Sequence, residues 1–65
     1  MVAMSSNMVA IKIAKAAGTL GVQACYNDRL GITYWAIMDD KGVIEICLTH
    51  TEAADIITAA TQTNN

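Results

Sequence analysis

The sequence predicts a small α+β domain of order α-β-β-β-α, in which two helices pack on a three-stranded antiparallel meander. Apolar residues recur at helical spacing near both ends of the chain. Between them, three short runs alternate apolar and polar residues, as strands do. Two Asp-x-x-Gly sequences, which begin at Asp28 and Asp39, fit the tight turns that would connect these strands.

The length of 65 residues allows one domain over 1–65, with 1–5 and 63–65 expected to be frayed ends. With 54% hydrophobic and 15% charged residues, the composition excludes intrinsic disorder. A domain of this size buries only about 60% of the surface that its unfolded chain exposes. So many apolar residues in so short a chain therefore favour self-association.

The charge balance argues against several partners. Lys and Arg total 4 against 6 Asp and Glu, and the basic residues are scattered, whereas nucleic-acid binding depends on many basic contacts to phosphate. The longest uncharged stretch, 16–27, is too short to span a membrane, and no basic segment of a signal peptide precedes it. Two cysteines do not make a disulfide scaffold. We expect a cytoplasmic protein with reduced thiols and neither nucleic acid nor membrane as partner.

The first helix is predicted over 6–17. Lys12 and Lys15 share one face, and Gly18 suits a left-handed C-terminal cap. From Thr19 to Tyr26 the residues alternate as in a strand. The alternative is a helix continued to Tyr26, which would carry two interior glycines at a cost of about 1 kcal/mol each.

The next two strands are predicted over 32–38 and 43–48. With one glycine bulge at each turn, one face of the meander is uncharged, and we expect both helices to cover it. Its pairs are Tyr26–Tyr34, Ala24–Ala36, Val22–Met38, Tyr34–Leu48, Ala36–Ile46 and Met38–Ile44. The last helix, predicted over 51–62, follows the capping-box sequence Thr49-His-Thr-Glu52.

The other face of the meander is the predicted site. It presents Trp35 in a row with Cys25 and Cys47, and its exposure would make it a protein interface, since Trp is a frequent hot-spot residue. The alternative is that one helix covers each face, which would make Trp35 a core residue. The predicted interface residues are Gln23, Cys25, Trp35, Ile37, Val43, Glu45 and Cys47.

The residues that carry chemistry are sparse. His50 and the two cysteines fall short of the four ligands of a structural zinc site, and nothing indicates an oxyanion hole beside a Cys–His pair. Turns, a helix cap and, for Asp55, a solvated helix face explain every carboxylate except Glu45. We therefore predict a protein that is not an enzyme, with no catalytic residues, no metal site and no cofactor.

The element order is similar to that of the double-stranded-RNA-binding domain, a resemblance of topology. That family has basic residues at the start of its last helix, where this chain reads Thr49-His-Thr-Glu-Ala-Ala-Asp55. The resemblance therefore does not extend to RNA binding. Instead, we expect a non-enzymatic interaction or assembly module that forms a homo-oligomer, most simply a dimer. The alternatives are a small inhibitor or adaptor, such as phages encode, that docks on a larger protein, and a minimal ligand-binding protein or enzyme with its site across an oligomer interface.

Overall fold

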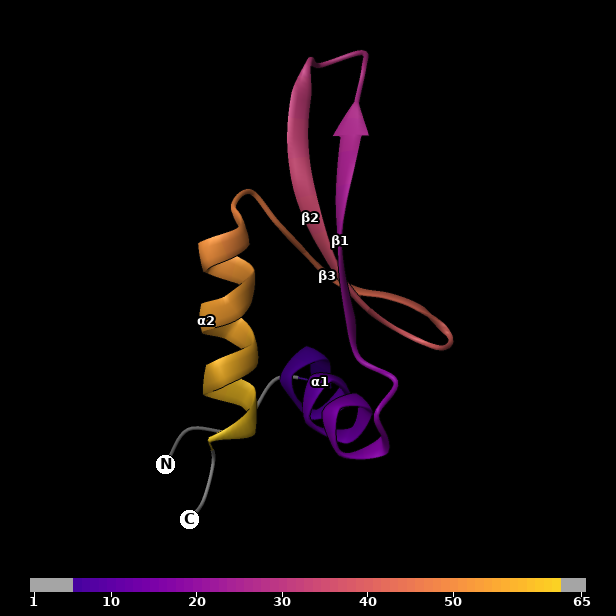
Figure 1. Cartoon of the computed structure of the whole chain (residues 1–65), viewed down its shortest axis with the longest axis vertical. Coiled ribbons are helices and arrows are strands. Elements are labelled where there is room, and N and C mark those ends of the chain that lie inside the picture. Colours follow the sequence, from indigo (N-terminus) through magenta and orange to yellow (C-terminus); the bar gives the residue numbers. More distant parts are fainter. Residues whose placement is uncertain (1–5, 63–65) are drawn as a thin grey trace.

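The computed structural model describes residues 6–62 and confirms the predicted fold class for them. In chain order the elements are α1 (Ser6–Ala17), β1 (Gly21–Asn27), β2 (Ile32–Asp39), β3 (Gly42–Cys47) and α2 (His50–Thr61). The strands form one antiparallel sheet of order β1-β2-β3, with α2 beside it and α1 across its lower end (Figure 1). Within residues 6–62 neither helix has the length and apolarity needed to cross a membrane. The expected frayed ends, 1–5 and 63–65, lie outside the described residues.

Helix α1 has the predicted bounds and ends at the predicted glycine. Gly18 has φ +76°, and its N–H donates to the carbonyl of Lys15 at 3.2 Å. The N–H of Thr19 donates to the carbonyl of Ala14 at 2.9 Å, so two of the last carbonyls of the helix are satisfied. The chain leaves the helix here and continues as a strand, which excludes the alternative of a longer helix.

Helix α2 is capped much as the sequence predicts and begins one residue earlier. Thr49 is extended, and its hydroxyl oxygen accepts from the N–H of Glu52 at 3.0 Å. The Glu52 carboxylate accepts from the N–H of Leu48 at 2.9 Å. The reciprocal bonds of a capping box are therefore present, with the carboxylate bonded one residue upstream of the expected donor.

The predicted register of the first hairpin is wrong by one residue. Asn27, rather than Asp28, holds the turn, since its side-chain oxygen accepts from the N–H of Leu30 at 3.1 Å and its carbonyl from that of Gly31 at 2.8 Å. Asn27 consequently pairs with Ile32, and Ala24 with Trp35 instead of Ala36. Asn and Asp supply the same turn-forming oxygen, so the sequence did not decide between the two neighbours.

The second hairpin keeps the predicted pairing of Ala36 with Ile46 and places the bulge elsewhere. Asp39 holds the turn by accepting from the N–H groups of Lys41 at 2.8 Å and Gly42 at 3.1 Å. The irregularity lies within the strands, where neighbouring pairs join Ile37 to Glu45 and Met38 to Val43. Ile44 is thereby left without a direct partner, and it packs against the core.

On β2 and β3 the helices cover the face opposite to the one expected, whereas Val22, Ala24 and Tyr26 of β1 stay on the helix side as predicted, because the register shifts by one residue. The core cluster joins Ile11 of α1 and two alanines of α2, Ala53 and Ala60, to Ile37 and Cys47 of the sheet. Ile37 is 0% exposed, whereas Ile46, predicted to be covered, is 52% exposed. Both faces carry large apolar residues, so hydrophobic alternation alone did not identify the covered one.

Replacing Ile37 by Ala tests which face is the core. We expect Ile37→Ala to lower the free energy of unfolding by about 2–5 kcal/mol, because it leaves a cavity beneath both helices. Ile13→Ala is the matched control, since Ile13 is 63% exposed on α1. Urea unfolding followed by circular dichroism measures both variants. An Ile37→Ala protein as stable as the Ile13→Ala protein would contradict the assignment of the core.

Candidate functional site

The structure divides the predicted interface residues between the two faces of the sheet. Trp35, Ile37, Glu45 and Cys47 lie on the face that the helices cover, and Gln23, Cys25 and Val43 on the opposite face. The row therefore reads Ala24–Trp35–Cys47, with Cys25 opposite Tyr34. The shifted turn moves Gln23 and Cys25, and the bulge moves Val43 opposite Met38. The open patch predicted around Trp35 is consequently wrong.

Trp35 contributes to the packing of α2 on the sheet. It is half-buried against the core cluster, and its ring meets that of His50 edge-on, with centroids 4.8 Å apart and an interplanar angle of 74°. Aromatic pairs favour this arrangement. His50 is the first residue of α2, so the contact fixes the start of the helix over β2. Nothing local in the sequence indicates this pair, because it joins residues of separate elements.

Glu45, the one carboxylate without an expected structural role, has one in the structure. Its Oε1 accepts from the side-chain amide of Asn7 at 2.7 Å. Asn7 lies in the first turn of α1, which contains no acidic residue of its own. The bond ties β3 to α1 and places a carboxylate at the positive end of the helix dipole.

Both cysteines are free thiols in the part of the chain that the structure describes, and they lie on opposite faces of the sheet. Cys47 is buried in the core. Burial raises the pKa of the Cys47 thiol, and the nearby carboxylates of Glu52 and Glu45 raise it further. The thiol is therefore protonated at neutral pH, which does not suit a nucleophile.

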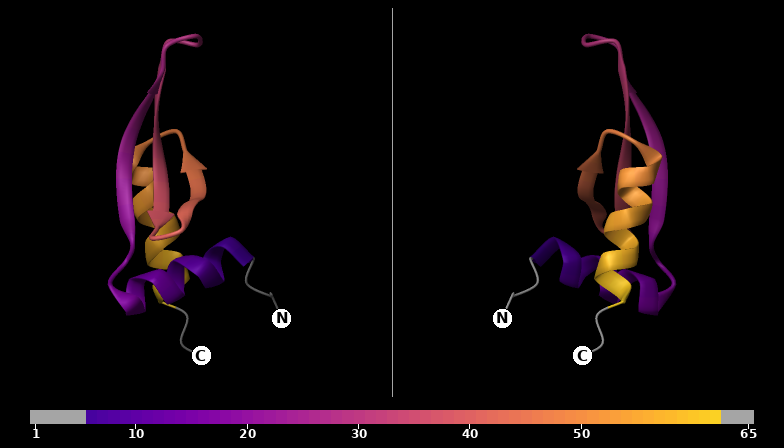
Figure 2. Two further views of the ribbon diagram at one scale, coloured as in Figure 1. Left: turned by 90° about the vertical axis from the view of Figure 1, so that its right-hand side faces the viewer. Right: turned by 90° about the vertical axis from the view of Figure 1, so that its left-hand side faces the viewer.

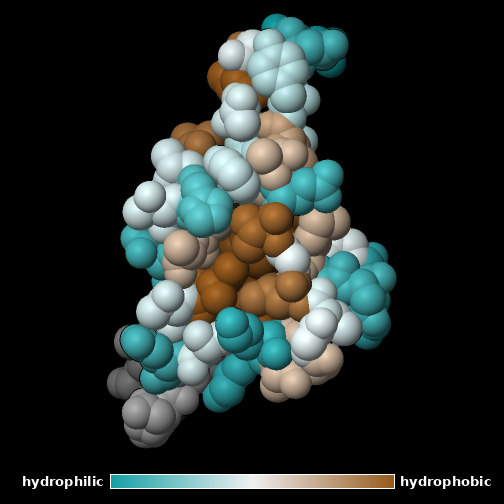
Figure 3. Space-filling model, viewed as in Figure 1, coloured by the Kyte–Doolittle hydropathy of each residue, from teal (hydrophilic) through white to brown (hydrophobic). Residues whose placement is uncertain are grey.

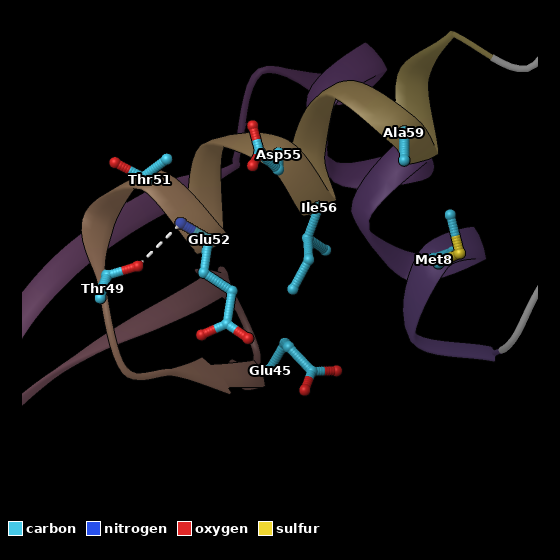
Figure 4. Close-up of a pocket in the computed structure, with 8 residues that line it drawn as sticks. All are labelled: Met8, Glu45, Thr49, Thr51, Glu52, Asp55, Ile56 and Ala59. Carbon is cyan, nitrogen blue, oxygen red and sulfur yellow. Dashed lines mark hydrogen bonds between the residues drawn. The ribbon is translucent and has the colours of Figure 1, made fainter.

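An acidic hollow of about 600 Å³ opens beside β3, between α2 and the start of α1 (Figure 4). Two of its carboxylates are already engaged, Glu45 with Asn7 and Glu52 with the N–H of Leu48. Figure 4 shows Asp55 directed away from these two. Among residues 6–62 no group of three or more His, Cys, Asp or Glu is placed to hold a metal ion. The hollow is lined by Met8, Glu45, Thr49, Thr51, Glu52, Asp55, Ile56 and Ala59.

The surface that stands out is the face of the sheet turned away from the helices, here called the open sheet face. None of its described residues is charged, and Ile32, Val43 and Ile46 are large apolar residues that remain exposed there. By strand alternation from the observed register, it comprises Gly21, Gln23, Cys25, Asn27, Ile32, Tyr34, Ala36, Met38, Val43 and Ile46. Ala36 on this face is buried, but exposed apolar surface such as that of its three large residues is typical of an interaction site.

No family model, no curated protein and no solved structure matches the chain. The function is therefore inferred from the geometry described above.

The environment of Cys47 predicts its reactivity. We expect iodoacetamide at pH 7.5 to leave Cys47 unmodified in the folded protein and to modify it in urea, because the thiol is both buried and protonated. Mass spectrometry of the two cysteine peptides measures this. The pKa of the Cys47 thiol is higher in the folded protein than in the unfolded chain. Protonation of this thiol therefore contributes to stability at pH values below the usual thiol pKa of about 8.5, and the contribution is lost as the pH rises through the pKa of the folded state. Modification of Cys47 at its unfolded rate would contradict the assignment.

Proposed function

We propose that the chain is a non-enzymatic interaction module that self-associates through the open sheet face. The observation that carries the proposal is the absence of charge on this face among the described residues, together with the exposure of Ile46 and Val43. A partner with charged groups would have to bury them unpaired, at a high cost. A second copy of the same face presents no charge and equivalent apolar side chains.

The small core supports the same proposal. The largest fully buried side chains of the described residues are Ile11, Ile37 and Cys47, and Ala53 and Ala60 complete the cluster. Domains of this size commonly need a disulfide, a metal or oligomerisation for stability. The two thiols are free and lie on opposite faces of the sheet. Association that buries the second face of the sheet would add the missing apolar burial.

The geometry of the open sheet face suits a symmetric dimer. Sheets that pack face to face lie about 10 Å apart with their inner side chains interdigitated. Both helices pack on the other face, so neither stands between two copies. A two-fold axis through such a contact lets each copy use the same residues, and this is the commonest symmetry of soluble oligomers.

A lysine on the open sheet face tests the proposal. We expect Ile46→Lys to reduce the mass of the assembly in solution while leaving the helix and strand signals intact, because it adds a charge to an uncharged interface. Ile13→Lys is the matched control, since Ile13 is also exposed, at 63% against 52% for Ile46, and lies on α1. Sedimentation at micromolar concentration measures the mass against the single-chain value of 6.9 kDa.

Two results would contradict the proposal. One is a wild-type protein that sediments as a single chain throughout the micromolar range. The other is a folded Ile46→Lys variant whose mass equals that of the wild-type assembly.

A further inference from the structure

The outer edge of β1 is an unprotected sheet edge. Within residues 6–62 no strand pairs with it, so its backbone N–H and C=O groups lie open to another strand. Proteins usually protect an edge by charge, proline, a bulge or a short strand. β1 has seven residues, Gly-Val-Gln-Ala-Cys-Tyr-Asn, with no charge and no proline, and it pairs with β2 without a register shift. The other edge strand, β3, is shorter, and it carries Glu45 and the irregularity at its pairing with β2.

We propose that β1 pairs with β1 of a second copy and joins two sheets into one of six strands. A strand that pairs with its own copy about a two-fold axis perpendicular to the sheet runs antiparallel to it. The contact uses the edge of the sheet and leaves its open face available. The inference shares with the proposed function only the identity of the partner, a second copy of this chain.

The side chains of β1 specify the register. Pairing centred on Ala24 sets Val22 opposite Tyr26 of the other chain, and the symmetry repeats this pair on the other side of the axis. All three residues lie on the helix-side face of the sheet, as their partners in β2 show. Val22 is 37% exposed and Tyr26 is 65% exposed, so both have surface to bury. A β-branched residue opposite an aromatic one is a favourable cross-strand pair.

The residues of β1 on the open sheet face also fit a second copy of the strand. In the same register Gln23 lies opposite Cys25 of the other chain, and no charged residues face each other. The uncharged run extends beyond the start of the strand and spans 16–27, so β1 itself presents no charge that would favour a charged peptide over a second copy. Because the β1 strand of the second copy runs antiparallel in this pairing, Val22 of each chain packs against Tyr26 of the other.

The arrangement of the elements leaves the edge accessible. The hairpin of β1 and β2 extends beyond both helices, so the end of β1 near Tyr26 is clear of them (Figure 2). Apolar side chains gather in a hollow between α2 and the sheet, above α1 (Figure 3). The helices make their main contacts with each other and with β2 and β3. The helix-side face of β1 thus keeps apolar surface for a neighbouring strand to cover.

A disulfide at the proposed two-fold axis tests the pairing directly. In the register centred on Ala24, the two copies of this residue face each other with Cα atoms about 4.5–5.5 Å apart, within the range of a disulfide. We expect Ala24→Cys in a Cys25→Ser background to form a covalent dimer under mild oxidation. Asp40→Cys in the same background is the control, since Asp40 is exposed in the turn between β2 and β3. Equal cross-linking of the two variants would overturn the proposal.

A charge at the axis provides a second, independent measurement. We expect Ala24→Lys to halve the mass of the wild-type assembly, because the two lysines would lie directly opposite each other. Thr33→Lys is the matched control, since Thr33 is exposed on the same face of the neighbouring strand. If Ala24→Lys halves the mass and Ile46→Lys does not, the edge pairing stands and the contact through the open sheet face fails. A folded Ala24→Lys protein with the wild-type mass would overturn the edge pairing alone.

Discussion

Two short helices cover one face of a three-stranded sheet, and the remaining features of the molecule depend on this constraint. Ile11 of α1 and two small residues of α2, Ala53 and Ala60, pack in one buried cluster with Ile37 and Cys47 of the sheet. Once both helices are committed to that face, no element of residues 6–62 is left to cover the other. The large apolar residues of the second face are exposed in the single chain because residues 6–62 supply no further element to cover them.

The bounds of the elements were largely predictable, because their signals are local. Gly18, Thr49 and Asp39 form their hydrogen bonds within five residues of themselves, and each occupies its predicted place. The face of the sheet that the helices cover was not predictable. It depends on the first turn, which either Asn27 or Asp28 could hold, and on contacts between helices and strands that are far apart in the sequence. The contacts of the candidate site residues were not predictable for the same reason. Trp35 with His50 and Asn7 with Glu45 are contacts between separate elements, which no spacing in the sequence reveals.

The carboxylates that invite a catalytic interpretation serve the fold. Asp39 holds a turn, Glu52 caps α2, and Glu45 joins β3 to α1. Asp39 and Glu52 accept from backbone N–H groups of a turn and of a helix start, which otherwise lack partners, whereas Glu45 lies within β3 and reaches the positive end of α1 through Asn7. These charged residues serve a turn, a helix cap and the contact of β3 with α1, and the described residues of the open sheet face carry no charge. The uncharged surface is therefore a consequence of where the fold uses its few charged residues.

The open sheet face and the outer edge of β1 are both uncharged, but only pairing along sheet edges can add strands without limit. The number of free edges therefore determines whether an assembly is closed. A sheet that paired along both edges would grow without limit, as aggregating edge strands do. Within residues 6–62 only β1 has a regular free edge, since the bulge at Ile44 and the charge of Glu45 interrupt β3. The proposed pairing of β1 with its own copy would use that edge completely and leave the two β3 edges outermost. In the proposed assembly, packing through the open sheet face would then join two such sheets, and four chains would form a closed set without a flat edge exposed among their described residues.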